Sequence, residues 1–292
     1  MTRWRLILLL LLSLALYAGC TTLDERQRTW IFQPSDRSWG GSAESARGMQ
    51  DVWVEFQSKA EGVPVKLHGL WLAAKPAAAS QGPLASREGP VLLYLHGARW
   101  NVEGSSARIR RMQELGFSVL AIDYRGFGKS SKALPSEAFA YEDARAAWDW
   151  LVAKYPQRPR YIFGHSLGGA IAIELASQVN DESGTIVEGT FTSIPDVFGS
   201  FKWGWLPLGP LITQRFEAAS KVAHIGSPLL VVHGTDDATI QPELGRRLFD
   251  AAVSPKALVM VMGGSHYNTN AVGQADYRRA LAELFSLTGL AQ

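Results

Sequence analysis

Cysteine is almost absent from this 292-residue chain, and neither charge is in surplus. The single cysteine, Cys20, excludes an intramolecular disulfide. Lys and Arg number 29 against 27 Asp and Glu, and the excess comes from Arg3 and Arg5, because residues 1–19 contain no acid. With no basic surplus, no Lys/Arg run and no binding motif, the sequence argues against nucleic-acid binding.

The chain also lacks an apolar run long enough to cross a bilayer. Leu6 to Tyr17 is the longest run, at about a dozen residues, whereas a membrane-spanning helix needs about 20. Preceded by Arg3 and Arg5, this run has the length of a signal-peptide core. We therefore predict a signal peptide over residues 1–19.

The residues that follow this run resemble a bacterial lipobox. In Tyr17-Ala18-Gly19-Cys20, small residues precede the cysteine, although Tyr17 stands where the pattern usually has leucine. The resemblance implies acylation of Cys20; an ordinary cleaved signal and an uncleaved anchor are the alternatives. Thr21 is not the aspartate that retains many lipoproteins at the inner membrane. The implied location is the bacterial cell envelope, at the periplasmic face of the outer membrane.

The remaining chain is predicted to be a polar tether over residues 20–28 and one domain over residues 29–292. A hydrophobic content of 47% and a charged content of 19% suit a globular α/β domain with a sizeable core. Trp30-Ile31-Phe32 is expected to dock on this domain as a small apolar patch. Residues 35–50 and 76–89 are predicted loops.

Strand and helix patterns alternate along the domain. Strands are predicted at 52–56, 65–72, 91–95, 118–122, 160–163, 185–187, 229–232 and 258–262, and helices at 103–115, 137–155, 244–252 and 274–287. The first two strands should form an antiparallel hairpin. The alternation predicts an α/β fold with a mostly parallel sheet, right-handed crossovers and helices on both faces. In such sheets ligands bind beyond the carboxyl ends of the strands.

One of these strand ends carries a Gly-x-Ser-x-Gly motif, Gly164-His165-Ser166-Leu167-Gly168. A short apolar run precedes the motif, and an apolar helix-forming run begins at Ala170. Strand, tight turn and helix are the context of a nucleophile elbow, in which the two glycines permit close backbone approach. Ser166 is therefore the candidate nucleophile; a flexible turn is the alternative.

With four further motifs, the sequence resembles an α/β-hydrolase over roughly residues 29–292. The motifs are Leu93-Tyr94-Leu95-His96-Gly97, Asp123-Tyr124-Arg125-Gly126-Phe127-Gly128-Lys129-Ser130, His233-Gly234-Thr235-Asp236-Asp237 and Gly263-Gly264-Ser265-His266. The chain is most similar to the small-lid serine hydrolases of the bud-emergence type, which include membrane-associated depalmitoylases. The resemblance is specific for fold and mechanism and weak for substrate.

A serine nucleophile needs a base, and the base needs a group that orients it. The order in this fold is Ser, acid, His, and His266 is the only histidine downstream of the acid. The family's His-Gly-Thr-x-Asp spacing selects Asp237 as the acid and leaves Asp236 as a solvated neighbour. Structural or flanking positions are assigned to His68, His96, His165, His224 and His233.

The resemblance also implies an oxyanion hole formed by the backbone N–H groups of Leu167 and Ala98. Arg99, Trp100 and Asn101 should line its mouth. A short cap insertion is expected at about residues 191–220. About half of its large apolar residues should pack on the core, and the others should form an acyl pocket or face a membrane: Phe191, Phe198, Phe201, Trp203, Trp205, Leu206, Leu208, Leu211 and Phe216.

The sequence therefore predicts a lipid-anchored serine hydrolase that cleaves carboxylic esters or thioesters through an acyl-enzyme. No metal or cofactor is implied, the partners are an acyl-bearing substrate and a membrane, and oligomeric state is not indicated. One alternative is a peptidase of the prolyl-aminopeptidase type, which would need a larger cap with acidic groups. The other is an inactive envelope binding protein, which an intact triad disfavours.

Overall fold

The computed structural model describes residues 19–35, 42–75, 89–202, 204–253 and 255–287. The predicted signal peptide, apart from residue 19, and most of the predicted loop at 76–89 lie outside these residues. Within them, no helix combines the length and the apolar character that crossing a membrane requires.

The core of the fold is an eight-stranded sheet with the order β1-β2-β4-β3-β5-β6-β7-β8. β1 and β2 form the expected antiparallel hairpin, β2 pairs antiparallel with β4, and all other pairs are parallel. The strands are Gln50–Gln57, Pro64–Leu72, Val91–Leu95, Ser118–Ile122, Arg160–His165, Gly184–Glu188, Leu229–Gly234 and Lys256–Val261. The predicted mostly parallel α/β fold is confirmed.

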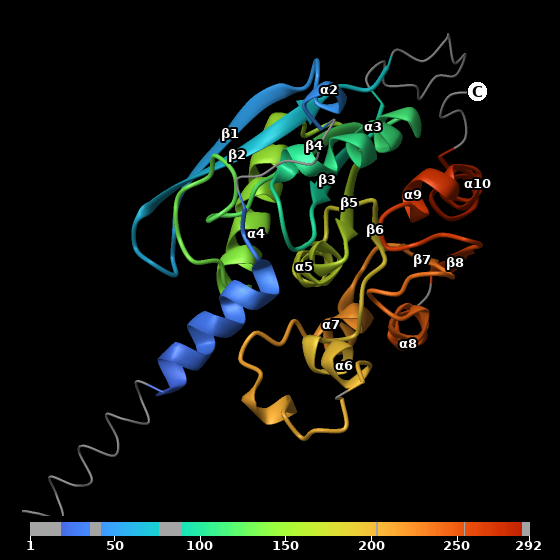
Figure 1. The fold of residues 1–292 in the computed structure, drawn as a ribbon. Helices are drawn as coiled ribbons and strands as arrows, with labels where there is room; N and C mark the ends of the chain where they lie inside the picture. The colour runs from blue at the N-terminus through green and yellow to red at the C-terminus, as the bar shows by residue number, and fades with distance from the viewer. Residues whose placement is uncertain (1–18, 36–41, 76–88, 203, 254, 288–292) are drawn as a thin grey trace, which may run out of the picture.

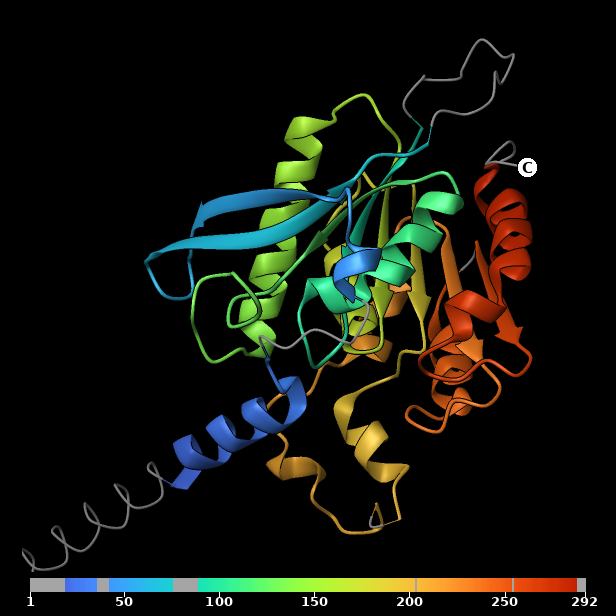
Figure 2. The ribbon, with the colours of Figure 1, turned by 45° about the horizontal axis from the view of Figure 1, so that its top comes forward.

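Helices cover both faces of this sheet (Figures 1 and 2). One face packs against α4 (Glu137–Lys154), α5 (Leu167–Ala176) and α8 (Pro242–Ala251). The other packs against α3 (Ser106–Glu114) and α10 (Gln274–Phe285). Strands between two such layers are apolar on both faces, which explains why all five residues of β3 are buried.

Several short elements were not predicted from the sequence. The predicted helix at 103–115 is divided into a 3-10 turn and α3. The short elements are α2 (Ser42–Ser45), η1 (Val102–Ser105), α6 (Ile194–Gly199), η2 (Gly209–Leu211), α7 (Ala218–Lys221), η3 (Val222–His224) and α9 (Thr269–Val272). Three of them, α6, η2 and α7, lie in the cap insertion. Its sequence has no long stretch in which apolar residues recur at helical spacing, so these elements were not expected.

The N-terminal segment differs from its prediction. Residues 19–32 form a continuous helix, the unlabelled blue helix of Figure 1, whereas the composition of 20–28 predicts a polar tether. Polar side chains of this helix have partners in the domain: Gln27 donates to the Leu211 carbonyl at 2.7 Å, and Arg28 donates to the Pro135 carbonyl at 2.8 Å. These contacts stabilise a helix that its own sequence does not reveal.

The apolar patch at the end of this helix docks only in part. Phe32 is fully buried and meets the rings of Phe127 and Phe216 edge-on, and Ile31 is buried as well. Trp30, in contrast, is 62% exposed. Within this patch, Phe32 and Ile31 are therefore the docked residues, and the indole of Trp30 stays largely exposed.

The cap insertion connects β6 to β7 and lies beside the N-terminal helix (Figure 2). Phe191 and Phe216 join the core, as expected for part of this set. Trp205 is 73% exposed. Phe201, Leu208 and Leu211 are exposed too, and Trp203 lies outside the described residues.

Candidate active site

Ser166 sits on a strained turn between β5 and α5. Its backbone has φ 55° and ψ −122°, a region that non-glycine residues rarely adopt. A Cβ on Gly164 would collide with the Gly168 carbonyl, and one on Gly168 would collide with the Leu95 carbonyl. The Ser166 amide donates to the Glu188 carbonyl at 2.9 Å, which ties the turn to β6. This is the geometry of a nucleophile elbow.

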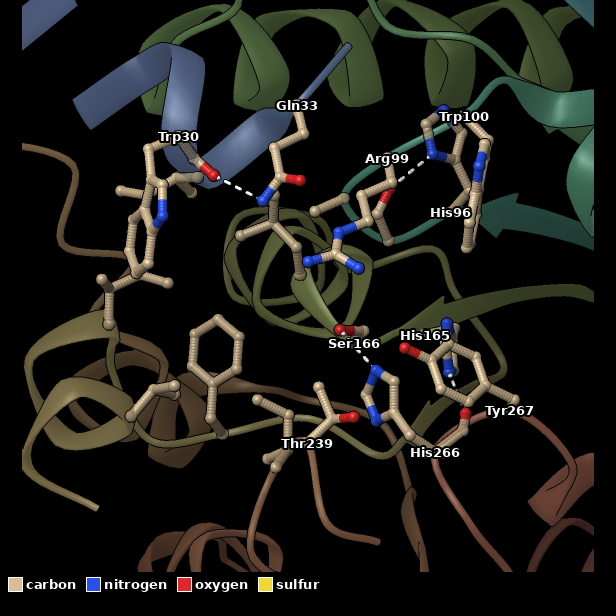
Figure 3. A pocket seen from close by; sticks show the side chains of 18 of the residues that line it. Trp30, Gln33, His96, Arg99, Trp100, His165, Ser166, Thr239, His266 and Tyr267 are labelled. Atoms are coloured by element: carbon tan, nitrogen blue, oxygen red, sulfur yellow. Dashed lines mark hydrogen bonds between the residues drawn. The ribbon is translucent and has the colours of Figure 1, made fainter. Parts of the chain in front are cut away.

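The structure brings the three sequence-selected side chains into one hydrogen-bonded chain. His266 Nε2 lies 3.0 Å from Ser166 Oγ, and His266 Nδ1 lies 2.7 Å from Asp237 Oδ2. Figure 3 shows the His266 ring directed at the serine. Each residue follows a different strand, so the sheet brings together groups separated by up to 100 positions. A base within hydrogen-bond reach of a hydroxyl can accept its proton during nucleophilic attack.

Asp237 is a buried carboxylate with four polar contacts. Its Oδ1 accepts from the amides of Thr239 and Ile240, both at 2.8 Å. Its Oδ2 faces His266 and lies 3.4 Å from His233 Nε2. Burial alone would raise its pKa, but hydrogen bonds from His233 and His266 outweigh it and hold the pKa of Asp237 below its ordinary value. Asp237 is therefore an anion at neutral pH, suited to orienting an imidazole.

Asp236 points elsewhere, accepting a 2.8 Å hydrogen bond from the Thr235 hydroxyl on an exposed surface. Of the two neighbours, the structure places only Asp237 against His266.

The other histidines near the site have structural contacts. His165 Nε2 lies 3.0 Å from the His266 carbonyl oxygen. Burial, the Arg108 cation and His266 hold the pKa of His165 well below its ordinary value, so its ring is neutral and its Nε2–H donates to that carbonyl. His233 Nε2 lies 3.0 Å from the Ile240 carbonyl and thus supports the Asp237 loop, a role its place in a His-Gly turn did not reveal.

Ala98 and Leu167, whose amides are the predicted oxyanion donors, line the pocket together with Ser166. A Cβ on Gly97 would lie 3.0 Å from Ser166 Cβ, which shows how close the loop after β3 comes to the elbow. Leu167 is the first residue of α5, where an N–H has no intrahelical acceptor. Among the described residues, neither amide donates to another protein group. Both are available to an oxyanion.

The serine opens into a large amphipathic pocket with a volume of about 930 Å³. One side is apolar and is formed by the N-terminal helix and the cap, including Leu23, Trp30, Ile31, Phe198, Leu211 and Ile212. The polar part of the lining comes mostly from the segment that runs from the end of β3 into α3 and includes Arg99, Asn101, Ser105, Ser106 and Arg108, together with Tyr267. Trp100 also lines it. Figure 3 shows Trp30 on one side of Ser166, and Trp100 and Tyr267 on the other.

Two features of the pocket were missed from the sequence. The N-terminal helix forms part of its wall, and no local pattern indicates this. A partly buried ion pair joins Arg108 Nε to the buried Glu188 Oε1 at 2.9 Å. Glu188 ends β6 at the carboxyl edge of the sheet, so the rule that ligands gather at this edge could have singled it out.

The part of the chain that the structure describes contains no group of three His, Cys, Asp or Glu residues arranged to hold a metal ion.

The family model described as "Serine aminopeptidase, S33" matches residues 87–216. An uncharacterized protein of Mycobacterium tuberculosis (strain CDC 1551 / Oshkosh) is 32% identical over 248 residues, which is 84% of this chain and 82% of that protein.

A second relative has a named activity. The lysophosphatidylserine lipase ABHD12 of Danio rerio is 32% identical over 188 residues, and the match covers 58% of this chain but only 49% of the lipase. Among solved structures, the esterase Pf2001 of Pyrococcus furiosus superposes with a TM-score of 0.63 over 86% of this chain and 98% of the esterase, at 19% identity. At that identity the superposition shows a shared fold.

Proposed function

Because the chain belongs to the α/β-hydrolase superfamily, in one family with the mycobacterial relative, and is a hydrolase, we propose that it cleaves carboxylic esters or thioesters through an acyl-enzyme. Three groups carry the chemistry in this proposal. Ser166 Oγ attacks the acyl carbon while His266 Nε2 takes its proton. Asp237 accepts a hydrogen bond from His266 Nδ1–H and stabilises the imidazolium that forms.

The negative charge that develops on the carbonyl oxygen is held by the amides of Ala98 and Leu167. Such a donor pair is preorganised, and each donor is worth about 10²–10³ in rate. His266 then protonates the leaving alkoxide or thiolate. Water, activated by the same imidazole, releases the acid and restores Ser166.

The observation that carries this proposal is the hydrogen-bonded chain from Ser166 to Asp237 at the base of a pocket with an apolar side. The chain supports activation of the nucleophile, and the apolar side supports a substrate with an acyl chain. A lipid ester is the substrate class we favour. The name of the ABHD12 relative, a lysophosphatidylserine lipase, points the same way.

The aminopeptidase alternative, which the family description keeps open, needs an acidic group to bind a substrate's amino terminus. Among the described residues that line the pocket, none is Asp or Glu. This charge pattern favours an ester over an aminoacyl substrate. An inactive binding protein is disfavoured because the contacts of Ser166, His266 and Asp237 are all present.

We further propose that the enzyme is anchored to a membrane by acylation of Cys20 in the bacterial envelope, at the periplasmic face of the outer membrane. Cys20 is exposed at the start of the helix whose far end carries Trp30. Exposed Trp30 and Trp205 lie on the N-terminal helix and the cap, and indoles favour membrane interfaces. An anchor at Cys20 would hold the pocket near a lipid surface.

This anchoring is tested by metabolic labelling with an alkyne fatty acid and mass spectrometry of the N-terminal peptide. We expect an acylated peptide beginning at Cys20, salt-resistant membrane association, and loss of the label in Cys20→Ser. An unmodified peptide that begins downstream of Cys20 would instead identify an ordinary secretory signal.

The activity is tested with a substrate panel and a fluorophosphonate probe, which reacts with activated serines. The panel contains p-nitrophenyl esters of increasing chain length, acyl thioesters and aminoacyl amides. We expect labelling at Ser166 and turnover of esters or thioesters with medium or long chains. Turnover restricted to aminoacyl amides would identify the protein as a peptidase. Absence of both labelling and turnover would identify it as an inactive binding protein.

A further inference from the structure

The guanidinium and carboxylate groups that line the pocket are unequal in number. Its described lining includes two arginines, Arg99 and Arg108, and no carboxylate. The charge that a ligand meets in this pocket depends on whether carboxylates neutralise the two guanidinium groups, so the partners of Arg99 and Arg108 influence its substrate preference.

Arg108 is neutralised inside the protein. Its Nε donates to Glu188 Oε1 at 2.9 Å, and the Glu188 carboxylate is buried and accepts a second hydrogen bond from the Tyr277 hydroxyl. A paired guanidinium and carboxylate at hydrogen-bond distance present little net charge to a ligand. Arg108 therefore shapes the polar side of the pocket without making it cationic.

Arg99 has no such partner. Among the described residues, no carboxylate oxygen lies within 4.0 Å of its guanidinium. Figure 3 shows its side chain entering the pocket and directed toward Ser166. Within the described residues, the pocket thus has one positive charge without a carboxylate partner, located beside the reacting centre.

The backbone that aims this side chain is strained. Arg99 has φ 70° and Trp100 has φ 55°, two consecutive left-handed residues in positions that favour glycine or asparagine. Such a conformation is costly for a residue other than glycine and persists only where the surrounding structure holds it. Here the Arg99 amide donates to the Phe32 carbonyl at 2.8 Å, and Pro34 pairs with Trp100. The shape of the turn does not explain an arginine at this position, because glycine or asparagine would adopt the same backbone conformation at lower cost.

We propose that Arg99 is an anion-binding group that selects esters whose alcohol part carries a phosphate or a carboxylate. The charge belongs to the alcohol part because burying an anion on the apolar side of the pocket would be costly. A guanidinium can hold either anion through paired hydrogen bonds. This proposal rests on the proposed esterase function, and it names the substrate class: single-chain lipids with an acidic headgroup.

The test compares esters with one acyl chain and different headgroups, presented at one mole fraction in neutral detergent micelles. Monoacylglycerol is neutral, lysophosphatidylcholine is zwitterionic, lysophosphatidylglycerol carries a phosphodiester, lysophosphatidic acid carries a phosphomonoester, and an acyl-glycerate carries a carboxylate. The proteins are the wild type, Arg99→Gln, Arg99→Lys and the control Arg246→Gln, which removes an exposed charge from α8.

We expect the wild type to have a higher kcat/KM for the anionic esters than for monoacylglycerol. In Arg99→Gln this ratio should fall about ten- to a hundredfold, the range expected for charge-assisted hydrogen bonds. Arg99→Lys should restore part of it, and Arg246→Gln should leave it unchanged. The ranking of the phosphodiester, the phosphomonoester and the carboxylate identifies the anion. A ratio that is the same in the wild type and Arg99→Gln would overturn the proposal.

A second measurement does not depend on turnover. Dodecyl phosphate should protect Ser166 of the wild type from fluorophosphonate labelling at lower concentrations than dodecyl phosphocholine does, and Arg99→Gln should lose this difference. Equal protection by both amphiphiles in the wild type would refute anion binding. Hydrolysis of monoacylglycerol without anion preference would leave the esterase intact and refute only the role of Arg99.

Discussion

The amide of Arg99 donates to the carbonyl oxygen of Phe32 at 2.8 Å. This bond joins the end of the N-terminal helix to the loop that carries the Ala98 amide, one of the two proposed oxyanion donors. In the proposed mechanism, the segment next to the proposed anchor therefore supports the catalytic site. Loosening it should affect the chemistry as well as the stability.

Phe32→Leu tests this coupling against Phe117→Leu, a fully buried phenylalanine on the opposite face of the sheet. Each change should lower the free energy of unfolding by about 1–3 kcal/mol. Only Phe32→Leu should also lower kcat, by several-fold, because the oxyanion donor becomes less well placed. Chemical denaturation and ester turnover well below the melting temperature provide the measurements. Equal turnover in the two variants would show that the Phe32 side chain acts only on stability.

Ser166→Ala should keep the fold and lose about 10⁶ in turnover, as removal of a serine nucleophile does elsewhere. Alanine retains the Cβ, so it adds no backbone strain at φ 55°. Fluorophosphonate labelling should disappear with the hydroxyl, whereas Ser177→Ala, at the far end of α5, should label normally. Continued labelling of the Ser166→Ala protein at another serine, together with turnover, would show that this other serine is the nucleophile.

Asp237→Asn should reduce kcat by about 10⁴, because an amide favours the wrong tautomer of His266. Asp236→Asn is the matched control, since its carboxylate is exposed and accepts a hydrogen bond from the neighbouring Thr235 hydroxyl. Its effect should stay within about tenfold, as expected for a screened charge. Steady-state kinetics measure kcat for both variants. Similar losses of kcat in Asp237→Asn and Asp236→Asn would contradict the assignment of Asp237.

His165 should make stability depend on pH. Its pKa in the folded protein lies well below the ordinary value because of burial, Arg108 and His266. Below about pH 6.5 this imidazole therefore binds more proton in the unfolded state than in the folded state, and its contribution lowers the free energy of unfolding as the pH falls, by up to about 1.4 kcal/mol per unit. The lowered pKa of Asp237 acts in a separate range, because its stabilisation is lost only as the pH drops below about 3.9.

His165→Asn removes this titration while keeping a side-chain donor for the His266 carbonyl. Its denaturation midpoint should vary less between pH 7 and pH 5 than that of the wild type. Parallel pH profiles for the two proteins would show that another group is responsible.

The sequence alone determined the features that depend on local patterns. The strands at 91–95 and 118–122 were predicted with the bounds they have, because a strand covered on both faces is apolar throughout. The elbow at Ser166 was also predictable, since its glycines are required by steric contacts within a few residues and with the adjacent strand. Motif spacing was sufficient to nominate Asp237 and His266 before their contact was known.

Tertiary structure alone decided the features that depend on distant partners. The helix at 19–32 has a polar sequence, and it is stabilised by contacts such as that of Gln27 with Leu211, 184 positions away. The left-handed backbone of Arg99 is held by Phe32, and the charge of Arg108 is neutralised by Glu188. In each case the energy that selects the conformation comes from groups far along the chain, so no local window of sequence contains it.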